Sequence, residues 1–312
     1  MIPCEILDAF WLPHNAVPLP GGQGNSWRAG NGVLKPHEAG YEWISEIVNQ
    51  LTPLNFRVSY HHTTIDGHYT YQGWWCTYFE LGQEVTGRIT EKYQIARELH
   101  DLLSNIEKPD GWHPSDSPWS RAHEVVWWER ELPEDIHPEI YEAIKGIIKL
   151  LKPIKIIEDL EKKVFRGQTV WAGWIQTEWW NQSIASFCPL NAFGTFGNKS
   201  TNESEICLNN QIIHGDLCWN ILFHDTLPPV VIDFSLDYRP RAYAEAILIA
   251  DSIAWEHGGE ESYSLLPPNS EQVLLRACLF RLITKALLKP KDVENFRVRW
   301  EGYRKIIQKI SK

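Results

Sequence analysis

The segment from His214 to Phe234 constrains this chain more than any other part of the sequence. It contains two short apolar runs separated by a turn with two adjacent prolines, a pattern that predicts a small buried hairpin. Polar residues stand at the edges of the apolar runs: Asp216 in a His-Gly-Asp triplet, Asn220 before the first run, and Asp233 after the second. We therefore expect Asp216 and Asn220 to lie beside Asp233 over one end of the hairpin.

These residue types suit one kind of chemistry. Carboxylate and amide oxygens are the ligands that Mg²⁺ prefers when it also holds substrate phosphates. A remaining carboxylate can accept the proton of an attacking hydroxyl. Asp and Asn also cap turns, which is the ordinary explanation for any one of them alone. The combination favours a site, and Asp233, flanked by large apolar residues, is predicted to be buried with a partner or a metal.

His-Gly-Asp, a downstream Asn and then Ile-Asp-Phe resemble the catalytic segment of the aminoglycoside phosphotransferase and choline kinase-like family, small-molecule relatives of the protein kinases. The resemblance implies that Asp216 is the catalytic base and that Asn220 and Asp233 hold Mg²⁺. His214, the other member of the catalytic triplet, is expected to fix the loop through its ring nitrogens. The spacing from Asp216 to Asn220 is one residue shorter than is usual in this family, so the metal geometry is less constrained than the base.

The resemblance also implies the fold, an α+β bilobal protein kinase-like fold. A small β-rich N-terminal lobe, residues 1–82, would bind the nucleotide and end in a hinge. A larger, mainly helical lobe, residues 83–312, would carry catalysis and substrate binding. The matching motifs stand in kinase order from about residue 18 to residue 255.

A glycine-rich stretch lies near the N-terminus and is followed by the strand Trp27–Ala29, a tight Gly-Asn-Gly turn and the strand Val33–Lys35. Glycines leave backbone N–H groups free to approach phosphate oxygens, because no Cβ blocks them. A plain hairpin is the alternative. The candidate nucleotide-binding residues of this stretch are Gly21, Gly22, Gly24 and Ser26.

Lys35 is the candidate for the strand lysine that, in the family, contacts the nucleotide phosphates and pairs with a helix glutamate. A helix is predicted from His37 to Leu51 by its apolar periodicity. Glu46 has the favoured spacing for the pair and Glu42 is close behind. A solvated helix face is the alternative explanation for both.

Strands are predicted at Val58–His61 and Tyr71–Phe79. The following residues, up to Gly82, resemble the hinge between the two lobes. The backbone of Glu80 and Leu81 is therefore expected to bind the adenine edge.

Further helices are predicted at about 88–103, 140–151, 242–255, 271–288 and 297–312. The helix at 242–255 is apolar nearly all round and should be buried. Its Asp251 is a candidate structural acid that fixes the catalytic loop. Residues 167–205 show no clean period and are rich in Trp, Asn, Ser and Gly, which indicates an insertion, with a lid over the substrate as the alternative.

Composition excludes several other classes of protein. The chain has 312 residues and a net charge of −10 without clustered Lys or Arg, which argues against nucleic-acid binding. Its six cysteines show no paired spacing, so neither a zinc site nor a disulfide framework is predicted. No signal peptide or membrane span is visible, and we expect a cytoplasmic protein without a membrane partner. Sixteen tryptophans, many in adjacent pairs, are typical of an aromatic core and surface, with an aromatic pocket as the alternative.

The sequence therefore predicts an ATP-dependent phosphotransferase that uses Mg²⁺ and moves the γ-phosphate to a hydroxyl of a small molecule. A non-catalytic nucleotide-binding module is the main alternative, and a metal-dependent hydrolase is a third. The acceptor stays open between aminoglycosides, choline-like amines, sugars and nucleosides. The oligomeric state is not predicted.

Overall fold

The computed structural model describes residues 2–20, 24–36, 42–112, 116–157 and 207–311. Residues 1–153 together with 210–312 form one compact unit, and Ile154–Asn209 form a second. The predicted insertion at 167–205 and the first residues of the predicted helix at 37–51 lie outside the described residues. Everything that positions the candidate site belongs to the first unit.

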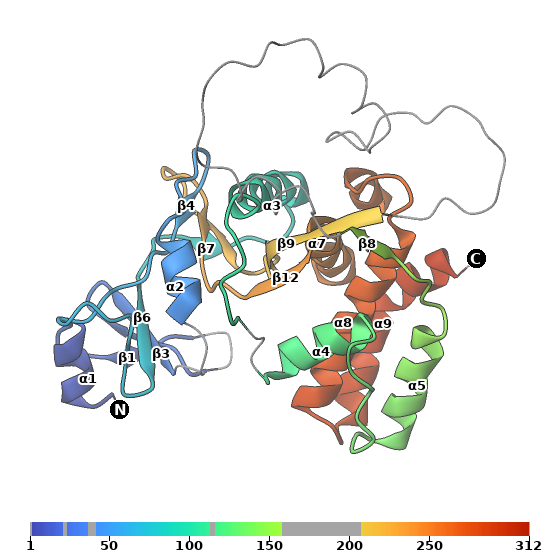
Figure 1. Ribbon diagram of the computed structural model, residues 1–312, viewed down its shortest axis with the longest axis horizontal. Coiled ribbons are helices and arrows are strands. Elements are labelled where there is room, and N and C mark those ends of the chain that lie inside the picture. The colour runs from blue at the N-terminus through green and yellow to red at the C-terminus, as the bar shows by residue number, and fades with distance from the viewer. Residues whose placement is uncertain (1, 21–23, 37–41, 113–115, 158–206, 312) are drawn as a thin grey trace, which may run out of the picture. The chain divides into compact units, whose positions relative to one another are not determined.

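A five-stranded antiparallel sheet makes up much of the N-terminal region, in the order β1-β2-β3-β6-β5 (Figure 1). The strands are β1 (Val17–Pro18), β2 (Trp27–Ala29), β3 (Gly32–Pro36), β5 (Thr70–Tyr71) and β6 (Trp74–Tyr78). The predicted strands and the tight turn between β2 and β3 are confirmed. The predicted strand at 71–79 is a hairpin instead, because Gly73 and the left-handed Gln72 turn the chain between β5 and β6.

Alternation along the strands gives the sheet two different faces. Leu34 and Cys76 are fully buried in a cluster with residues of the helix α1 (Cys4–Ala9) and with Phe10, which follows it, and Trp74 packs against this cluster. Trp75, opposite Lys35 in the register, lies on the other face. The pair Trp74-Trp75 therefore places its rings on opposite sides of the sheet, as strand geometry requires.

A second sheet has the order β4-β11-β10-β7. Its centre is the predicted hairpin of β10 (Ile221–Phe223) and β11 (Val230–Val231), paired antiparallel. Beside it lie β4 (Arg57–Val58), parallel to β11, and β7 (Gln83–Glu84), antiparallel to β10. The sheet thus joins segments from the N-terminal third to the hairpin that carries the candidate site.

Helices dominate the C-terminal region, in agreement with the predicted α+β fold class (Figure 1). The helix α2 (Glu42–Val48) lies between β3 and β4, and the later helices are α3 (Ile89–Leu103), α4 (Pro118–Val126), α5 (Pro138–Ile148), α7 (Arg241–Trp255), η2 (Glu260–Leu265), α8 (Glu271–Leu288) and α9 (Val293–Ile310). The buried helix α8 contacts α4, α5, α7 and α9. Among the described residues, no helix combines the length and apolar character needed to cross a membrane.

The strand β9 (Cys207–His214) leads into the candidate catalytic loop. Its second half pairs antiparallel with β12 (Leu236–Pro240), with His214 opposite Leu236. In the second unit, β8 (Lys155–Ile157) pairs in parallel with Cys207–Asn209. The strand β12 and the helices α1 and α4 were not predicted from the sequence.

Candidate functional site

The loop that carries Asp216 is fixed by backbone hydrogen bonds at its start. Gly215 N donates to Ser235 O at 2.9 Å, and Asp216 N donates to His214 Nδ1 at 3.1 Å. His214 is fully buried, and burial lowers its pKa to about 4. A neutral imidazole whose Nδ1 lone pair is already occupied positions the loop, and His214 is therefore not placed to act as a base.

Asn220 joins Asp216 to the strand that precedes Asp233. Its side-chain Nδ2 donates to the backbone carbonyl of Asp216 at 2.6 Å, and its own carbonyl accepts from Ile232 N at 2.9 Å. The amide oxygen Oδ1 has no hydrogen-bond partner among the described residues. The short loop thus brings Asn220 back to the Asp216 backbone with one oxygen left for a ligand.

Asp233 does not have the environment that its apolar neighbours predicted. Its side chain is 47% exposed and forms an ion pair with Lys35 Nζ at 2.6 Å. The strand β11 ends at Val231, and the backbone of Asp233 is left-handed, with φ of 53°. This conformation is uncommon for a residue with a side chain and often marks a functional position. The turn directs Asp233 outward, whereas Phe234 is buried.

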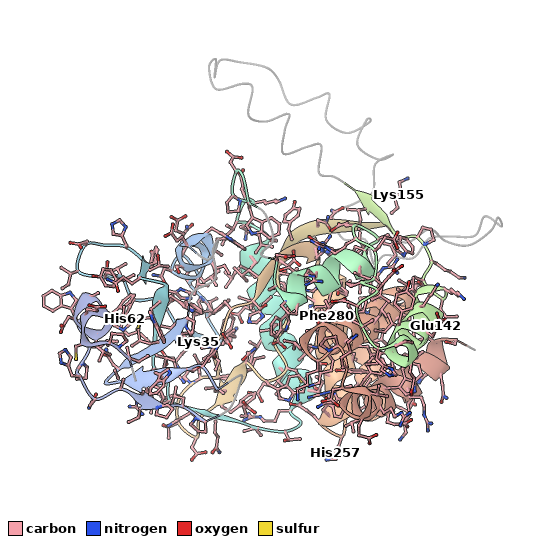
Figure 2. The ribbon with its side chains drawn as sticks, turned by 90° about the horizontal axis from the view of Figure 1, so that it is seen from below. Lys35, His62, Glu142, Lys155, His257 and Phe280 are labelled. Carbon is pink, nitrogen blue, oxygen red and sulfur yellow. The ribbon has the colours of Figure 1, made fainter. Side chains whose placement is uncertain are left out.

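Lys35 has a different partner from the one predicted. Helix α2 turns Ile44, Ser45, Ile47 and Val48 inward. Glu46 falls on the opposite, exposed face, and Glu42 accepts a hydrogen bond from Thr70 Oγ1 at 3.1 Å. No ion pair joins Lys35 to either glutamate in the described part of the chain. Figure 2 shows Lys35 among the N-terminal strands, where its partner is Asp233.

A neutral histidine lies near the Lys35–Asp233 pair. Ser45 Oγ and His61 Nδ1 are 2.5 Å apart, and the ring of His61 contacts that of Trp75 at 4.7 Å between centroids. The pKa of His61 is lowered to about 3, mainly by burial and further by the charge of Lys35. Where a helix glutamate was expected, α2 therefore presents a serine that binds an uncharged imidazole.

The glycine-rich stretch is the loop between β1 and β2, which are paired antiparallel. Leu19 N donates to Ser26 O at 2.9 Å and closes the base of the loop. Gly24 is left-handed with open space around it. Gly21 and Gly22 lie outside the described residues.

The predicted hinge connects β6 to β7. Arg57 pairs with the carboxylate of Glu80 and donates to the carbonyl of Leu81 at 2.7 Å. A side chain at Gly82 would come within 2.8 Å of Leu222 Cβ, so the chain runs close against β10 here. The carbonyl of Leu81 is thus already paired, whereas its side chain is exposed.

Arg281 is the charged residue of this site that the sequence analysis missed. From α8, its Nη2 contacts Asp216 Oδ1 and Asp251 Oδ2, each at 2.5 Å. Asp251, on α7, is fully buried and also accepts from Tyr303 Oη at 2.6 Å. Asp251 was predicted to fix the catalytic loop, and it reaches that loop through Arg281. A single arginine within the apolar run Ala277–Ile283 was the available signal.

The candidate metal ligands of this site are side-chain oxygen atoms. In the described part of the chain, no group of three or more His, Cys, Asp or Glu side chains is placed to hold a metal ion. Asn220 Oδ1 and the exposed carboxylate of Asp233 are suitable ligands for a hard cation that keeps several waters or phosphate oxygens. The residues therefore fit Mg²⁺ bound together with a nucleotide.

Comparisons with known proteins show the fold. No family model matches the sequence, and no curated protein matches it. Choline kinase LicA from Streptococcus pneumoniae is 13% identical, with a TM-score of 0.53, and the alignment covers 98% of this chain and 96% of that one. An aminoglycoside phosphotransferase from Alicyclobacillus acidocaldarius is 12% identical, with a TM-score of 0.52 and coverage of 100% and 96%. A thermostable mutant of aminoglycoside phosphotransferase APH(4)-Ia, in a ternary complex with ADP and hygromycin B, is 13% identical, with a TM-score of 0.52 and coverage of 98% and 97%. The chain has the fold of these small-molecule kinases, as predicted.

Proposed function

We propose that this chain is an ATP-dependent phosphotransferase that moves the γ-phosphate to a hydroxyl group of a small molecule. One observation supports the proposal: Asn220 is hydrogen-bonded both to the backbone of Asp216 and to Ile232, the residue before Asp233, and Asp233 forms an ion pair with Lys35. A strand lysine, an oxygen-ligand pair and a separate carboxylate are the parts that phosphoryl transfer needs. The similar fold crystallised with ADP and hygromycin B supports the same chemistry.

The nucleotide would bind to the N-terminal lobe, for which we propose residues 1–82. The backbone of the glycine-rich loop would cover the phosphates, and Lys35 would exchange Asp233 for phosphate oxygens. The hinge at Glu80 and Leu81 would meet the adenine. Because Arg57 occupies the carbonyl of Leu81, the remaining backbone groups of the hinge must make this contact.

Asn220 and Asp233 would hold Mg²⁺, which supplies positive charge against the transferring phosphoryl group. Release of Asp233 from Lys35 frees its carboxylate for this role. The larger lobe, residues 83–312, would bind the acceptor.

Asp216 would orient the acceptor hydroxyl and take its proton. Its side chain is one-quarter exposed, and in the described structure its Oδ2 has no hydrogen-bond partner. The protein would then contribute mainly position and electrostatics, because the transition state of phosphoryl transfer is loose.

The test is ATP consumption by the purified protein with Mg²⁺ and a panel of hydroxylated amines, sugars, nucleosides and aminoglycosides. Asp216→Asn should lower the rate with the best acceptor by roughly 100-fold or more, since a general base contributes about 10²–10⁴. Binding of Mg-ATP, measured by calorimetry, should persist. Asp225→Asn, the same change at an exposed position in the turn of the hairpin, should leave the rate unaltered.

Equal activity of the wild type and Asp216→Asn would refute the base assignment. Binding of Mg-ATP without transfer to any acceptor would favour the non-catalytic module instead. Absence of Mg-ATP binding would leave only the hydrolase among the functions that the sequence suggests.

A further inference from the structure

The carboxylate of Asp216, the candidate base, forms an ion pair with Arg281. Asp216 Oδ1 lies 2.5 Å from Arg281 Nη2, and the arginine comes from the middle of α8, 65 residues along the chain. Among the described residues this is the ion pair that Asp216 makes. The other carboxylate oxygen, Oδ2, is unpaired there, so the two oxygens of Asp216 are not equivalent.

A second layer of contacts fixes the guanidinium. Arg281 Nε lies 3.1 Å and 3.0 Å from the two oxygens of Asp251, and Nη2 contacts Asp251 as well. Tyr303 Oη donates to Asp251, and Trp255 Nε1 donates to Tyr303 Oη at 3.0 Å. These groups come from α7, α8 and α9, whose packing is extensive. The arginine therefore cannot follow Asp216 if the loop moves.

Arg281 and Asp251 are both largely shielded from solvent. The side chain of Arg281 is 11% exposed and that of Asp251 is fully buried. Burial opposes the charge of Arg281, but the charges of Asp216 and Asp251 offset it and raise the pKa of the guanidinium. An arginine that needed only one acid to balance it would be satisfied by Asp251. Its reach to Asp216 is an additional contact with the site.

We propose that Arg281 is a positioning residue for the proposed phosphoryl transfer, on which this inference rests: it holds Oδ1 of Asp216, so that Oδ2 is the oxygen that accepts the acceptor's proton. The acceptor hydroxyl gives its proton to Oδ2 while its oxygen bonds to the γ-phosphorus. The bond from the γ-phosphorus to the bridging oxygen breaks, and ADP leaves with the electron pair. Arg281 takes no proton in this step and fixes the position of the Asp216 carboxylate.

Other groups around this cluster also titrate or carry charge. From α4, His123 stacks on Phe280 at 4.0 Å between ring centroids, and its Nδ1 lies 3.0 Å from Tyr243 Oη. The remaining groups that act electrostatically on Arg281 or Asp251, or feel the charge of Arg281, Asp216 or Asp251, are His214, Cys218, Tyr243, Cys278 and Tyr303.

The decisive variants change the charge of Arg281 without leaving a buried carboxylate alone. The double variant Arg281→Gln with Asp251→Asn replaces both charges by hydrogen-bonding amides. Arg281→Lys keeps the charge but loses the planar fork. For each variant, kcat, the KM for ATP and the unfolding midpoint are measured. Arg297→Gln, which removes an exposed ion pair of α9 with Glu139, is the matched control.

The double variant should lower kcat by roughly tenfold or more while the KM for ATP changes less than about threefold, because a base held loosely loses part of its contribution. Arg281→Lys should lie between the double variant and the wild type. Arg297→Gln should match the wild type.

A double variant with the kcat of the wild type overturns the inference. A double variant whose KM for ATP rises as much as its kcat falls also overturns it, because the loss would then affect nucleotide binding and not the position of the base.

Failure of the proposed function would look different. If Asp216→Asn is fully active, the base assignment itself is wrong and Arg281 loses its role. If Asp216→Asn is inactive and the double variant behaves like the wild type, only the inference about Arg281 is wrong.

Discussion

Two ion pairs of the candidate site differ in how firmly they are held. Lys35 and Asp233 meet at 2.6 Å with side chains 21% and 47% exposed. Asp216 and Asp251 share Arg281 with side chains 26%, 0% and 11% exposed. The first pair faces solvent and has one contact, whereas the second is tied to three helices through Tyr303 and Trp255.

The difference matches the two tasks that we propose. An exposed pair gains little from its partner and can exchange it for a phosphate or a metal ion at small cost. A buried cluster has no such alternative, because removing one member leaves a charge without water or a partner. The Lys35–Asp233 pair, proposed to bind the nucleotide, is thus suited to exchange partners. The cluster of Asp216, Arg281 and Asp251 is suited to hold the proposed base in one position.

The largest effect is expected in acid, where histidines buried on both sides of the site should make the fold less stable. His100, His123 and His214 are buried near the base side, and His61 is buried near Lys35. Burial lowers the pKa of His61 and His100 to about 3, that of His214 to about 4, and that of His123 well below its usual range. Below pH 6.5 the unfolded chain therefore binds protons that the folded chain does not, and stability must fall as the pH falls.

Each such histidine should reduce the free energy of unfolding by about 1.4 kcal/mol per pH unit between pH 6.5 and its folded pKa. Asp237 and Asp251, whose pKa burial raises, act in the opposite sense at lower pH. The wild type and His100→Gln are therefore compared: the free energy of unfolding in urea is measured for both from pH 7.5 to 5. The free energy of unfolding should depend less steeply on pH in the variant, by about 1.4 kcal/mol per pH unit, because one titrating histidine is removed. His14→Gln, at an exposed position, serves as the control. Equal slopes for the wild type and His100→Gln would contradict the prediction.

Loss of the buried acid should give the next largest effect. Asp251→Ala leaves Arg281 buried with only the partly exposed Asp216 as a partner, and it removes the acceptor of Tyr303. Breaking a buried pair in this way costs about 3–5 kcal/mol. Asp101→Ala, which removes an acid 67% exposed that pairs with Arg241, should cost about 0–1 kcal/mol by the same urea measurement.

The apolar double variant Asp251→Leu with Arg281→Met tests the cause. If desolvated charge is the reason for the loss, this variant should regain most of the stability, because neither charge remains to be satisfied. A double variant as unstable as Asp251→Ala would instead point to misfitted packing between α7 and α8.

Local patterns predicted the parts of the site that are close in sequence. The hairpin at 221–231, the strand of Lys35 and the helix at 271–288 follow from apolar periodicity and turn residues. The family resemblance added the order of these parts and the fold. Since each depends on neighbours within a few residues, the sequence was sufficient for them.

Contacts between distant segments were beyond such patterns. In the sequence, Arg281 is a single polar residue within an apolar helix, and none of its neighbours indicates that Asp216 is its partner. The strand β12 was missed because Asp237 and Arg239 interrupt its apolar character, yet both are buried, and Arg239 binds Glu129 through both guanidinium Nη atoms. Glu46 had a suitable spacing from Lys35, but the helical period of α2 places it on the exposed face.

The same limit applies to tryptophan pairs. Trp74-Trp75 lies on a strand and its rings take opposite faces. Trp127-Trp128 instead follows the end of α4, and both rings lie about 5 Å from the guanidinium of Arg276, at 5.0 and 5.1 Å from the ring centroids. The pair Trp179-Trp180 lies outside the described residues. Adjacent rings separate only where the backbone is extended, which the pair itself does not specify.

The smallest effect on stability is expected at Lys35. Lys35→Met removes an exposed contact, so the free energy of unfolding should change by less than about 1 kcal/mol. Affinity for Mg-ATP should nevertheless fall by roughly tenfold or more, since a charge-assisted contact to phosphate is worth about 1.5–3 kcal/mol. Calorimetry and urea unfolding on the same samples measure both. Lys289→Met, which removes a pair with Asp292 whose lysine is more exposed, should change neither much. A large loss of stability without a loss of affinity would mean that the Lys35–Asp233 pair holds the fold together, and the contrast with the buried cluster would no longer stand.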